Sequence, residues 1–229
     1  WLSMMSYGFT SDHALVSGYN RIGRAGGFFN KLQRAINMHE SLMMLARAVA
    51  GRPYRVSRHN SGQSKALFFA NRGFTDHLRL NVGESDLYIQ QIAPYAESNV
   101  IINPKGVTES VPYEKVAVWY NRRKFFSYPF RFFRGGARFY IAASYLFTAL
   151  FWVSSITLAV ISSSELRIAA LSMIALRWIV IMAVTARFSR RTGDKAPHTA
   201  MLLYDFISPA EILLLTASRN ILSLKNLWI

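Results

Sequence analysis

Apolar residues are gathered in the C-terminal part of the chain, where two long runs follow one another. The first run, Phe139–Ser164, holds no charged residue, and the second, Ile168–Ala186, holds only Arg177. A helix needs about 20 predominantly apolar residues to cross the hydrocarbon core of a membrane. We therefore predict two transmembrane helices, over about 139–162 and 168–187, joined by a short turn.

A third apolar segment differs from these two because it is shorter and carries acidic residues. Met201–Leu215 contains Asp205 and Glu211 on either side of a proline. This composition predicts a helix over about 199–217 that lies in the membrane interface or re-enters the membrane without crossing it. A lone charge inside a span is costly. Arg177 therefore either reaches the membrane surface or has a partner, and we predict an ion pair with Asp205.

The first 115 residues show shorter and mixed patterns. Apolar residues at helical spacing run over Phe28–Ala50 and stop before a glycine and a proline. The β-branched run Val100–Ile102 predicts a strand, and Ser85–Ala93 has the spacing of a helix. The expected fold class is an α/β region over 1–115, followed by an α-helical membrane region over 139–229.

A basic and aromatic segment joins the two regions over 116–138. Its cationic side chains are interleaved with Trp, Tyr and Phe, a mixture that suits the level of the lipid headgroups, so we predict an interfacial helix. The net charge of +15 indicates an anionic partner, either a membrane surface or a nucleic acid. We favour membrane lipids and no nucleic acid, because the basic residues flank the apolar runs.

The placement of the basic residues also predicts an orientation. Arginines are frequent before the first apolar run and after the second, whereas the turn between them holds only Arg167. By the positive-inside rule, the soluble part and the C-terminus then face the cytoplasm. The chain begins with Trp1 and contains no cysteine, so we interpret it as a piece of a longer protein in which no disulfide or cysteine metal site forms within this stretch.

Two carboxylates one residue apart, Glu84 and Asp86, follow Gly83 at the start of a predicted helix. A carboxylate near a helix N-terminus is stabilised as the anion, and Glu84 could accept the proton of a substrate hydroxyl as a general base. The alternative is that both acids only cap the helix. The polar loop His59–Lys65 could contact a phosphate or sugar through its backbone N–H groups. The five histidines show no pattern typical of a metal site.

Several short motifs follow one another in a definite order. They are Trp1-Leu2, Leu15-Val16-Ser17-Gly18-Tyr19, the loop Arg58–Phe68, Gly73-Phe74, His77, Gly83–Tyr88, Trp119 and Asn121-Arg122-Arg123-Lys124-Phe125. This order resembles the C-terminal part of a bacterial, membrane-bound glycosyltransferase of family 2, which has a GT-A-type fold. The last motif departs from the family's pattern, because Asn121 and Lys124 stand where the family has Gln and Arg, and Lys cannot make the planar bidentate contact of Arg.

The resemblance implies an inverting enzyme that transfers a sugar from a nucleotide-sugar donor to a lipid-linked or polysaccharide acceptor, in envelope glycan synthesis at the cytoplasmic membrane. It implies that Glu84 is the catalytic base and Asp86 a second acid. It assigns substrate-binding roles to Asn60, Lys65, His77, Trp119, Asn121, Arg122, Arg123 and Lys124.

The same resemblance implies a divalent cation, Mg²⁺ or Mn²⁺, that neutralises the diphosphate of the donor. Its ligands are expected mostly before Trp1, together with the nucleotide-binding half, and none is assigned in this chain. The alternative to an enzyme is a non-catalytic membrane-anchored scaffold that recruits a partner or an anionic lipid through its basic cytoplasmic region.

Overall fold

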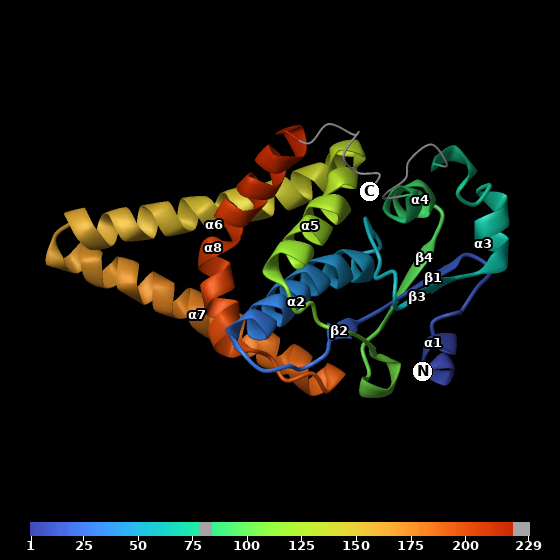
Figure 1. Ribbon diagram of the computed structural model, residues 1–229, viewed down its shortest axis with the longest axis horizontal. Coiled ribbons are helices and arrows are strands. Elements are labelled where there is room, and N and C mark those ends of the chain that lie inside the picture. Colours follow the sequence, from blue (N-terminus) through green and yellow to red (C-terminus); the bar gives the residue numbers. More distant parts are fainter. Residues whose placement is uncertain (78–83, 222–229) are drawn as a thin grey trace.

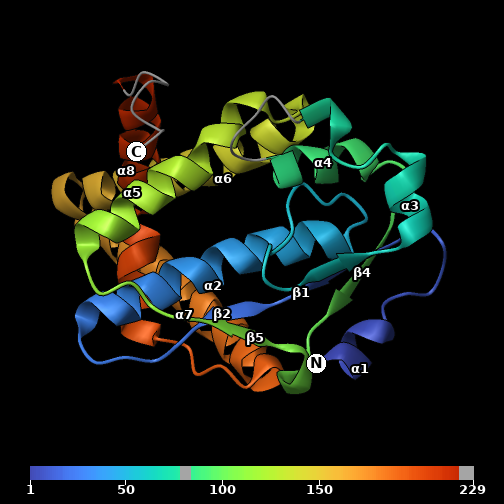
Figure 2. The same cartoon turned by 45° about the vertical axis from the view of Figure 1, so that its right-hand side comes forward.

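The structure is a computed structural model that describes residues 1–77 and 84–221, without the side chains of His77, Glu84 and residues 219–221. A small α/β part lies at one end, and a long helical hairpin extends from the other (Figure 1). Figure 2 shows the helix α2 (Phe28–Val49) in the middle of the molecule, between the strands and the other long helices.

Strand β1 (Ala14–Gly18) is the centre of a three-stranded sheet with the order β3-β1-β4. It pairs antiparallel with β3 (Ser61–Gln63) and parallel with β4 (Glu97–Ile101). All five residues of β1 are buried, as expected for a strand covered on both faces. The predicted strand at Val100–Ile102 corresponds to the end of β4, so that prediction is confirmed.

Two further strands, β2 (Asn20–Ile22) and β5 (Thr108–Ser110), form a separate parallel pair. The short helices are α1 (Leu2–Ser6), α3 (Lys65–Ala70) and α4 (Glu84–Ile92), with single 3-10 turns at Thr75–His77 and Pro104–Gly106. Helix α4 confirms the helix predicted over 85–93. The α/β region is therefore present, while its likeness to a GT-A domain stays a prediction.

Helix α2 confirms the helix predicted over 28–50 and holds the two parts of the molecule together. It packs against the strands on one side and against α8 (His198–Ile221) on the other. Polar residues on α2 are buried with partners, since the Gln33 amide both donates to and accepts from the backbone of Tyr113, at 2.8 and 3.0 Å. A buried amide that satisfies both of its groups fixes the packing of two segments.

The basic segment 116–138 is divided in the structure, although one interfacial helix was expected. Helix α5 (Val116–Ser127) is followed by a 3-10 turn over Tyr128–Phe132, and a new helix begins at Gly135. Pro129 lacks a backbone N–H, so it removes one helical hydrogen bond and favours a break in the α-helix at this point.

Three helices of the described part are long and apolar enough to cross a membrane: α6 (Gly135–Ile161), α7 (Ser164–Thr192) and α8. Helices α6 and α7 form the hairpin at the two predicted spans. Helix α8 corresponds to the helix predicted over about 199–217 and continues to Ile221. It was expected to be too short and polar to cross a membrane, whereas its length and composition are sufficient. Figure 1 shows α8 crossing the hairpin instead of running along it.

The predicted pairing of Arg177 with Asp205 is confirmed. The guanidinium of Arg177 donates to both carboxylate oxygens of Asp205, at 2.8 and 2.7 Å. The indole N–H of Trp152 donates to the same carboxylate at 3.2 Å, and the hydroxyl of Thr148 accepts from Arg177 at 3.2 Å. Because both charges have several partners, the cost of placing them among apolar helices is offset.

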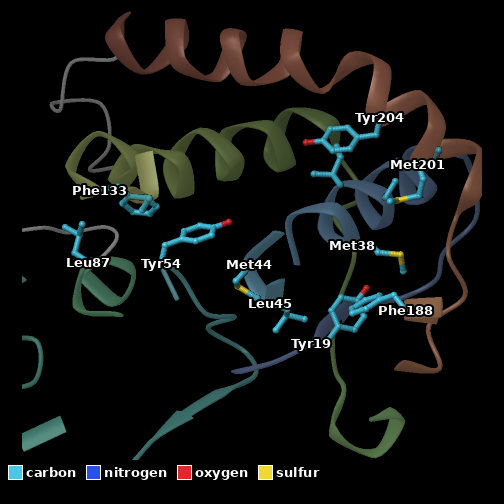
Figure 3. Close-up of a cluster of buried hydrophobic side chains, with 14 residues drawn as sticks. Tyr19, Met38, Met44, Leu45, Tyr54, Leu87, Phe133, Phe188, Met201 and Tyr204 are labelled. Carbon is cyan, nitrogen blue, oxygen red and sulfur yellow. The ribbon is translucent and has the colours of Figure 1, made fainter. Parts of the chain in front are cut away.

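One hydrophobic core runs through both parts of the molecule. Figure 3 shows it extending from Leu87 and Phe133 past α2 to Phe188, Met201 and Tyr204. The α/β part and the apolar helices thus share buried side chains, and the α/β part has a second, separate cluster that includes Leu15, Tyr88 and Ile92.

The link between α7 and α8 is tied to the first strands. Gly193 ends α7 in the left-handed conformation, at φ 69°, which suits glycine. The next residue, Asp194, is buried, and its carboxylate accepts hydrogen bonds from the hydroxyl of Tyr19 at 2.8 Å and the guanidinium of Arg34 at 2.9 Å. These bonds fix the position of the membrane helices against the α/β part.

Candidate functional site

A cavity of about 260 Å³ lies where α2, the loop after it, α5, α6 and α8 meet. Apolar side chains from all of these elements and from the 3-10 turn at 128–132 contribute to its wall. Its polar wall holds the titratable and charged side chains Glu40, Arg55, Arg58, His59 and Arg123. A hollow with converging polar groups at the junction of two structural parts is the usual place of a binding site. We call this hollow the charged cavity.

Arg123 is the centre of a three-residue cluster beside the charged cavity. Its Nη2 donates to Glu40 at 2.9 Å, and its Nε donates to Glu211 of α8 at 2.6 Å. Burial would lower the pKa of Arg123, but the two carboxylates outweigh burial and raise it. Burial would likewise raise the pKa of Glu40, but Arg123 and Arg55 outweigh it and hold it below its usual value. The cluster around Arg123 therefore joins the helices α2, α5 and α8.

Arg55 connects the charged cavity to the start of α4. Its Nε donates to the buried carboxylate of Asp86 at 3.1 Å, and its Nη2 donates to the backbone oxygen of Phe126 at 3.2 Å. Burial would lower the pKa of Arg55, and the charges of Asp86 and Glu40 reverse this effect. Asp86 thus fixes the first turn of α4 against the cavity wall. Glu84, two residues earlier, begins α4, but its side chain lies outside the described residues.

Arg58 differs from the other two arginines of the charged cavity. It is exposed, and its guanidinium lies over the ring of Phe126, at 4.9 Å from the centroid. Among the described residues it forms no ion pair. Arg55 and Arg123 are paired with Asp86, Glu40 and Glu211, so Arg58 is the cationic side chain of this lining that is left for an anionic group such as a phosphate.

Asn60, which was predicted to bind substrate, is fully buried and bonded to the protein. Its amide nitrogen donates to the backbone oxygens of Tyr19 and Gly106, both at 2.7 Å, and its oxygen accepts from the indole of Trp1 at 2.9 Å. All of these bonds join separate segments of the α/β part. In this structure Asn60 therefore supports the fold, and it does not line the charged cavity.

Lys65 and His77 also lie away from the charged cavity lining. Lys65 is exposed at the first position of α3. His77 ends a 3-10 turn, and its side chain lies outside the described residues. Neither role that the resemblance implies is tested by these positions.

The motif Asn121–Phe125 on α5 contributes only part of its polar side chains to the charged cavity. Of its four polar residues, Arg123 lines the cavity, whereas Arg122 lines a smaller hollow of about 170 Å³ next to it, together with Trp119. The ring of Trp119 lies under Arg123, at 5.3 Å. Asn121 is exposed, and Lys124 lies over the ring of its neighbour Tyr120.

The sequence did not predict Glu40 or Arg55 at this site, nor the pairing of Glu211 with Arg123 beside the cavity. Glu40 lies within a long predicted helix, where a single acid has no distinguishing mark. Arg55 follows a proline in a short loop, in a chain that has 27 lysines and arginines. Glu211 did carry a signal, because an acid in an apolar segment needs a partner.

In the part of the chain that the structure describes, no three His, Asp or Glu side chains are grouped so that they could hold a metal ion. Comparisons of the chain with protein-family models, with curated proteins and with solved structures found no match.

Proposed function

We propose that this chain is the acceptor-side part of a membrane-anchored, inverting glycosyltransferase. The observation that carries the proposal is the charged cavity, which faces the start of α4 on one side and the apolar helices on the other. An enzyme that joins a water-soluble nucleotide sugar to a membrane-bound acceptor needs its site at such a junction. The order of motifs in the sequence supports the same activity.

In this proposal Glu84 acts as the general base. The acceptor hydroxyl attacks the anomeric carbon, its proton passes to Glu84, and the bond from that carbon to the nucleotide diphosphate breaks on the opposite face. Asp86 does not react, because Arg55 occupies it and it holds the start of α4 in place. Arg58 stabilises the negative charge of the diphosphate or of an acceptor phosphate. Residues outside this chain would hold the divalent cation, Mg²⁺ or Mn²⁺.

The membrane arrangement is also part of the proposal. Helices α6 and α7 cross the cytoplasmic membrane, with the α/β part and the end of α7 on the cytoplasmic side. Helix α8 re-enters the apolar region beside the hairpin, which is supported by the contacts of its Asp205 with Trp152 of α6 and Arg177 of α7, while its contact with α2 ties it to the α/β part. This arrangement keeps the site close to a lipid-linked or polysaccharide acceptor.

The test is sugar transfer in membranes that contain the chain joined to the coding region upstream of Trp1. Radiolabel is followed from nucleotide sugars into the lipid and polymer fractions. We expect Glu84→Gln to lower the rate by about 100-fold or more, while the exposed Glu114→Gln leaves it unchanged. A normal rate for Glu84→Gln at equal protein level would show that Glu84 is not the base.

The non-catalytic scaffold remains the second candidate, and the exposed arginines of 116–138 favour it. A scaffold would bind anionic membranes through these residues and would transfer no sugar from any nucleotide donor. The absence of transfer from a full panel of nucleotide sugars, together with salt-sensitive binding to anionic vesicles, would favour the scaffold.

A further inference from the structure

A second hollow, of about 500 Å³, lies beside the charged cavity and has an apolar wall. Ile141 and Leu146 of α6 and Ile212 and Leu213 of α8 contribute to this wall. The volume falls in the range of about 300–1,000 Å³ that is usual for small-molecule sites. We call this hollow the lipid groove.

The charged residues among those that line the lipid groove are Arg131 and Arg138. Both are exposed, and neither forms an ion pair with a described residue. Arg131 is oriented by two rings, with its guanidinium 5.5 Å from the ring centroid of Tyr128 and 5.1 Å from that of Phe132. An apolar groove that carries two cations at one end is complementary to an amphiphile with an anionic head.

The length of the lipid groove fits one membrane leaflet. Along α6 its lining runs from Arg138 to Ala149, about 16 Å at 1.5 Å per residue. The hydrocarbon core of a membrane is about 30 Å thick, so one leaflet is about 15 Å. The arginines therefore lie at headgroup level when α6 crosses the membrane, and the apolar wall reaches to about the midplane.

The lipid groove and the charged cavity are neighbours. Phe130, Ile141, Tyr145 and Ile212 line both of them. An anionic head held at the end of the groove is thus next to the wall that carries Arg55 and Arg58.

We propose that the lipid groove binds one hydrocarbon chain of a lipid phosphate, with Arg131 and Arg138 on the phosphate. The assignment of that lipid as the acceptor rests on the proposed function, and it selects a lipid-linked acceptor over a soluble polysaccharide. The binding itself is measured without any sugar donor, so it succeeds or fails independently of catalysis.

The experiment uses the full chain in nanodiscs doped with a photoactivatable lipid. The probe is phosphatidic acid with a diazirine near the end of one acyl chain, and the comparison lipid is phosphatidylcholine with the same chains. After illumination, the labelled residues are identified by mass spectrometry. We expect labels at Leu146, Ala149 or Leu213, with about five-fold more labelling from phosphatidic acid.

Two kinds of variant distinguish binding of the lipid headgroup from binding of its hydrocarbon chain. Arg131→Gln with Arg138→Gln should abolish the preference for phosphatidic acid, whereas Arg134→Gln should keep it, since Arg134 is exposed in the same segment but does not line the lipid groove. Arg131→Lys with Arg138→Lys should keep most of the preference, because it keeps the charge.

To test binding of the hydrocarbon chain, Ala149→Trp fills the lipid groove and should abolish labelling there. Val153→Trp is the matched control, because Val153 is exposed on α6 outside the groove. Equal labelling by the two lipids, or equal loss in the two tryptophan variants, would overturn the proposal. If labelling is as expected but no sugar is transferred, the lipid site stands and the glycosyltransferase proposal fails. If sugar is transferred but phosphatidic acid labels no better than phosphatidylcholine, the glycosyltransferase proposal stands and the lipid site is rejected.

Discussion

Helix α8 carries two acidic residues that enter two different kinds of cluster. Asp205 binds Arg177 through both of its oxygens and also accepts from Trp152, so this cluster lies wholly among the apolar helices. Glu211 shares Arg123 with Glu40, and this cluster borders the charged cavity. The first cluster is a closed pair, whereas the second has one cation for two carboxylates. If a ligand displaced one carboxylate of the second cluster, Arg123 would keep the other as its partner. In the first cluster, Arg177 would lose its one carboxylate partner among the described residues.

The largest effect is expected when the closed pair is broken. Asp205→Asn leaves Arg177 without a countercharge among apolar helices, and breaking such a pair costs on the order of 3 kcal/mol of stability. The measurement is the fraction of folded protein after heating in detergent, followed by size-exclusion chromatography. Asp205→Asn combined with Arg177→Met should recover much of the loss. An unchanged melting temperature for Asp205→Asn would contradict the closed-pair interpretation.

The shared cluster should respond differently. Glu40→Gln or Glu211→Gln alone leaves Arg123 one carboxylate, so each should cost only about 1 kcal/mol. The double variant leaves Arg123 largely buried and unpaired, and should cost about 3 kcal/mol, more than the sum of the single effects. Denaturant unfolding of the four proteins measures the coupling. Simple additivity would show that the two acids act independently and do not share Arg123.

A pH dependence is expected from His39, which precedes Glu40 on α2. Burial lowers the pKa of His39 below its usual 6.5, despite the nearby Glu40 and Asp205. The unfolded chain takes up this proton near pH 6.5, so the stability that neutral His39 contributes is complete above pH 6.5 and is lost as the pH falls through the lower folded value. Melting temperatures between pH 8 and 5 should therefore decline, and His39→Gln should reduce the decline. The exposed His13→Gln is the control, and an equal decline in all three proteins would argue against this origin.

The smallest effect is expected at the surface. Arg21 and Glu109 form a 2.6 Å ion pair, but their side chains are 37% and 51% exposed. Water and salt screen such a pair, so Glu109→Gln should cost less than about 1 kcal/mol. The loss should shrink further in 0.5 M salt, where screening is strong. If Glu109→Gln lowered the stability as much as Asp205→Asn does, burial would not explain the difference between the two ion pairs.

The apolar helices were the most predictable part of the molecule. The runs at 139–162 and 168–187 gave α6 and α7, because an uninterrupted apolar stretch has few other stable states. The partner of Arg177 followed from the same physics. The bounds of α8 followed to within a few residues, because a helix was predicted over about 199–217. That α8 is apolar enough to cross a membrane did not follow, because its acids seemed to interrupt the apolar segment, whereas in the fold Asp205 and Glu211 are paired.

The candidate site was much less predictable. The motif around Asp86 was found, but its partner Arg55 is 31 residues away in the sequence, and no spacing rule links them. Glu40, Arg123 and Glu211 come from three helices, and their separations of 83 and 88 residues carry no local signal. Tertiary packing alone brings these residues together. The side chain of Glu84 lies outside the described residues, so its role as base stays a prediction.

The bond between Tyr19 and Asp194 has a consequence for how the protein is made. The two residues are 175 positions apart in the chain. At a synthesis rate of about 5–20 residues per second, the ribosome needs roughly 10–35 s to deliver the second partner after the first. During that interval the early strands lack the bond to Asp194, while the hairpin of α6 and α7 is being synthesised. In the proposed membrane arrangement, insertion of this hairpin precedes completion of the α/β part, and a delay in insertion would leave that part exposed to proteases and to aggregation.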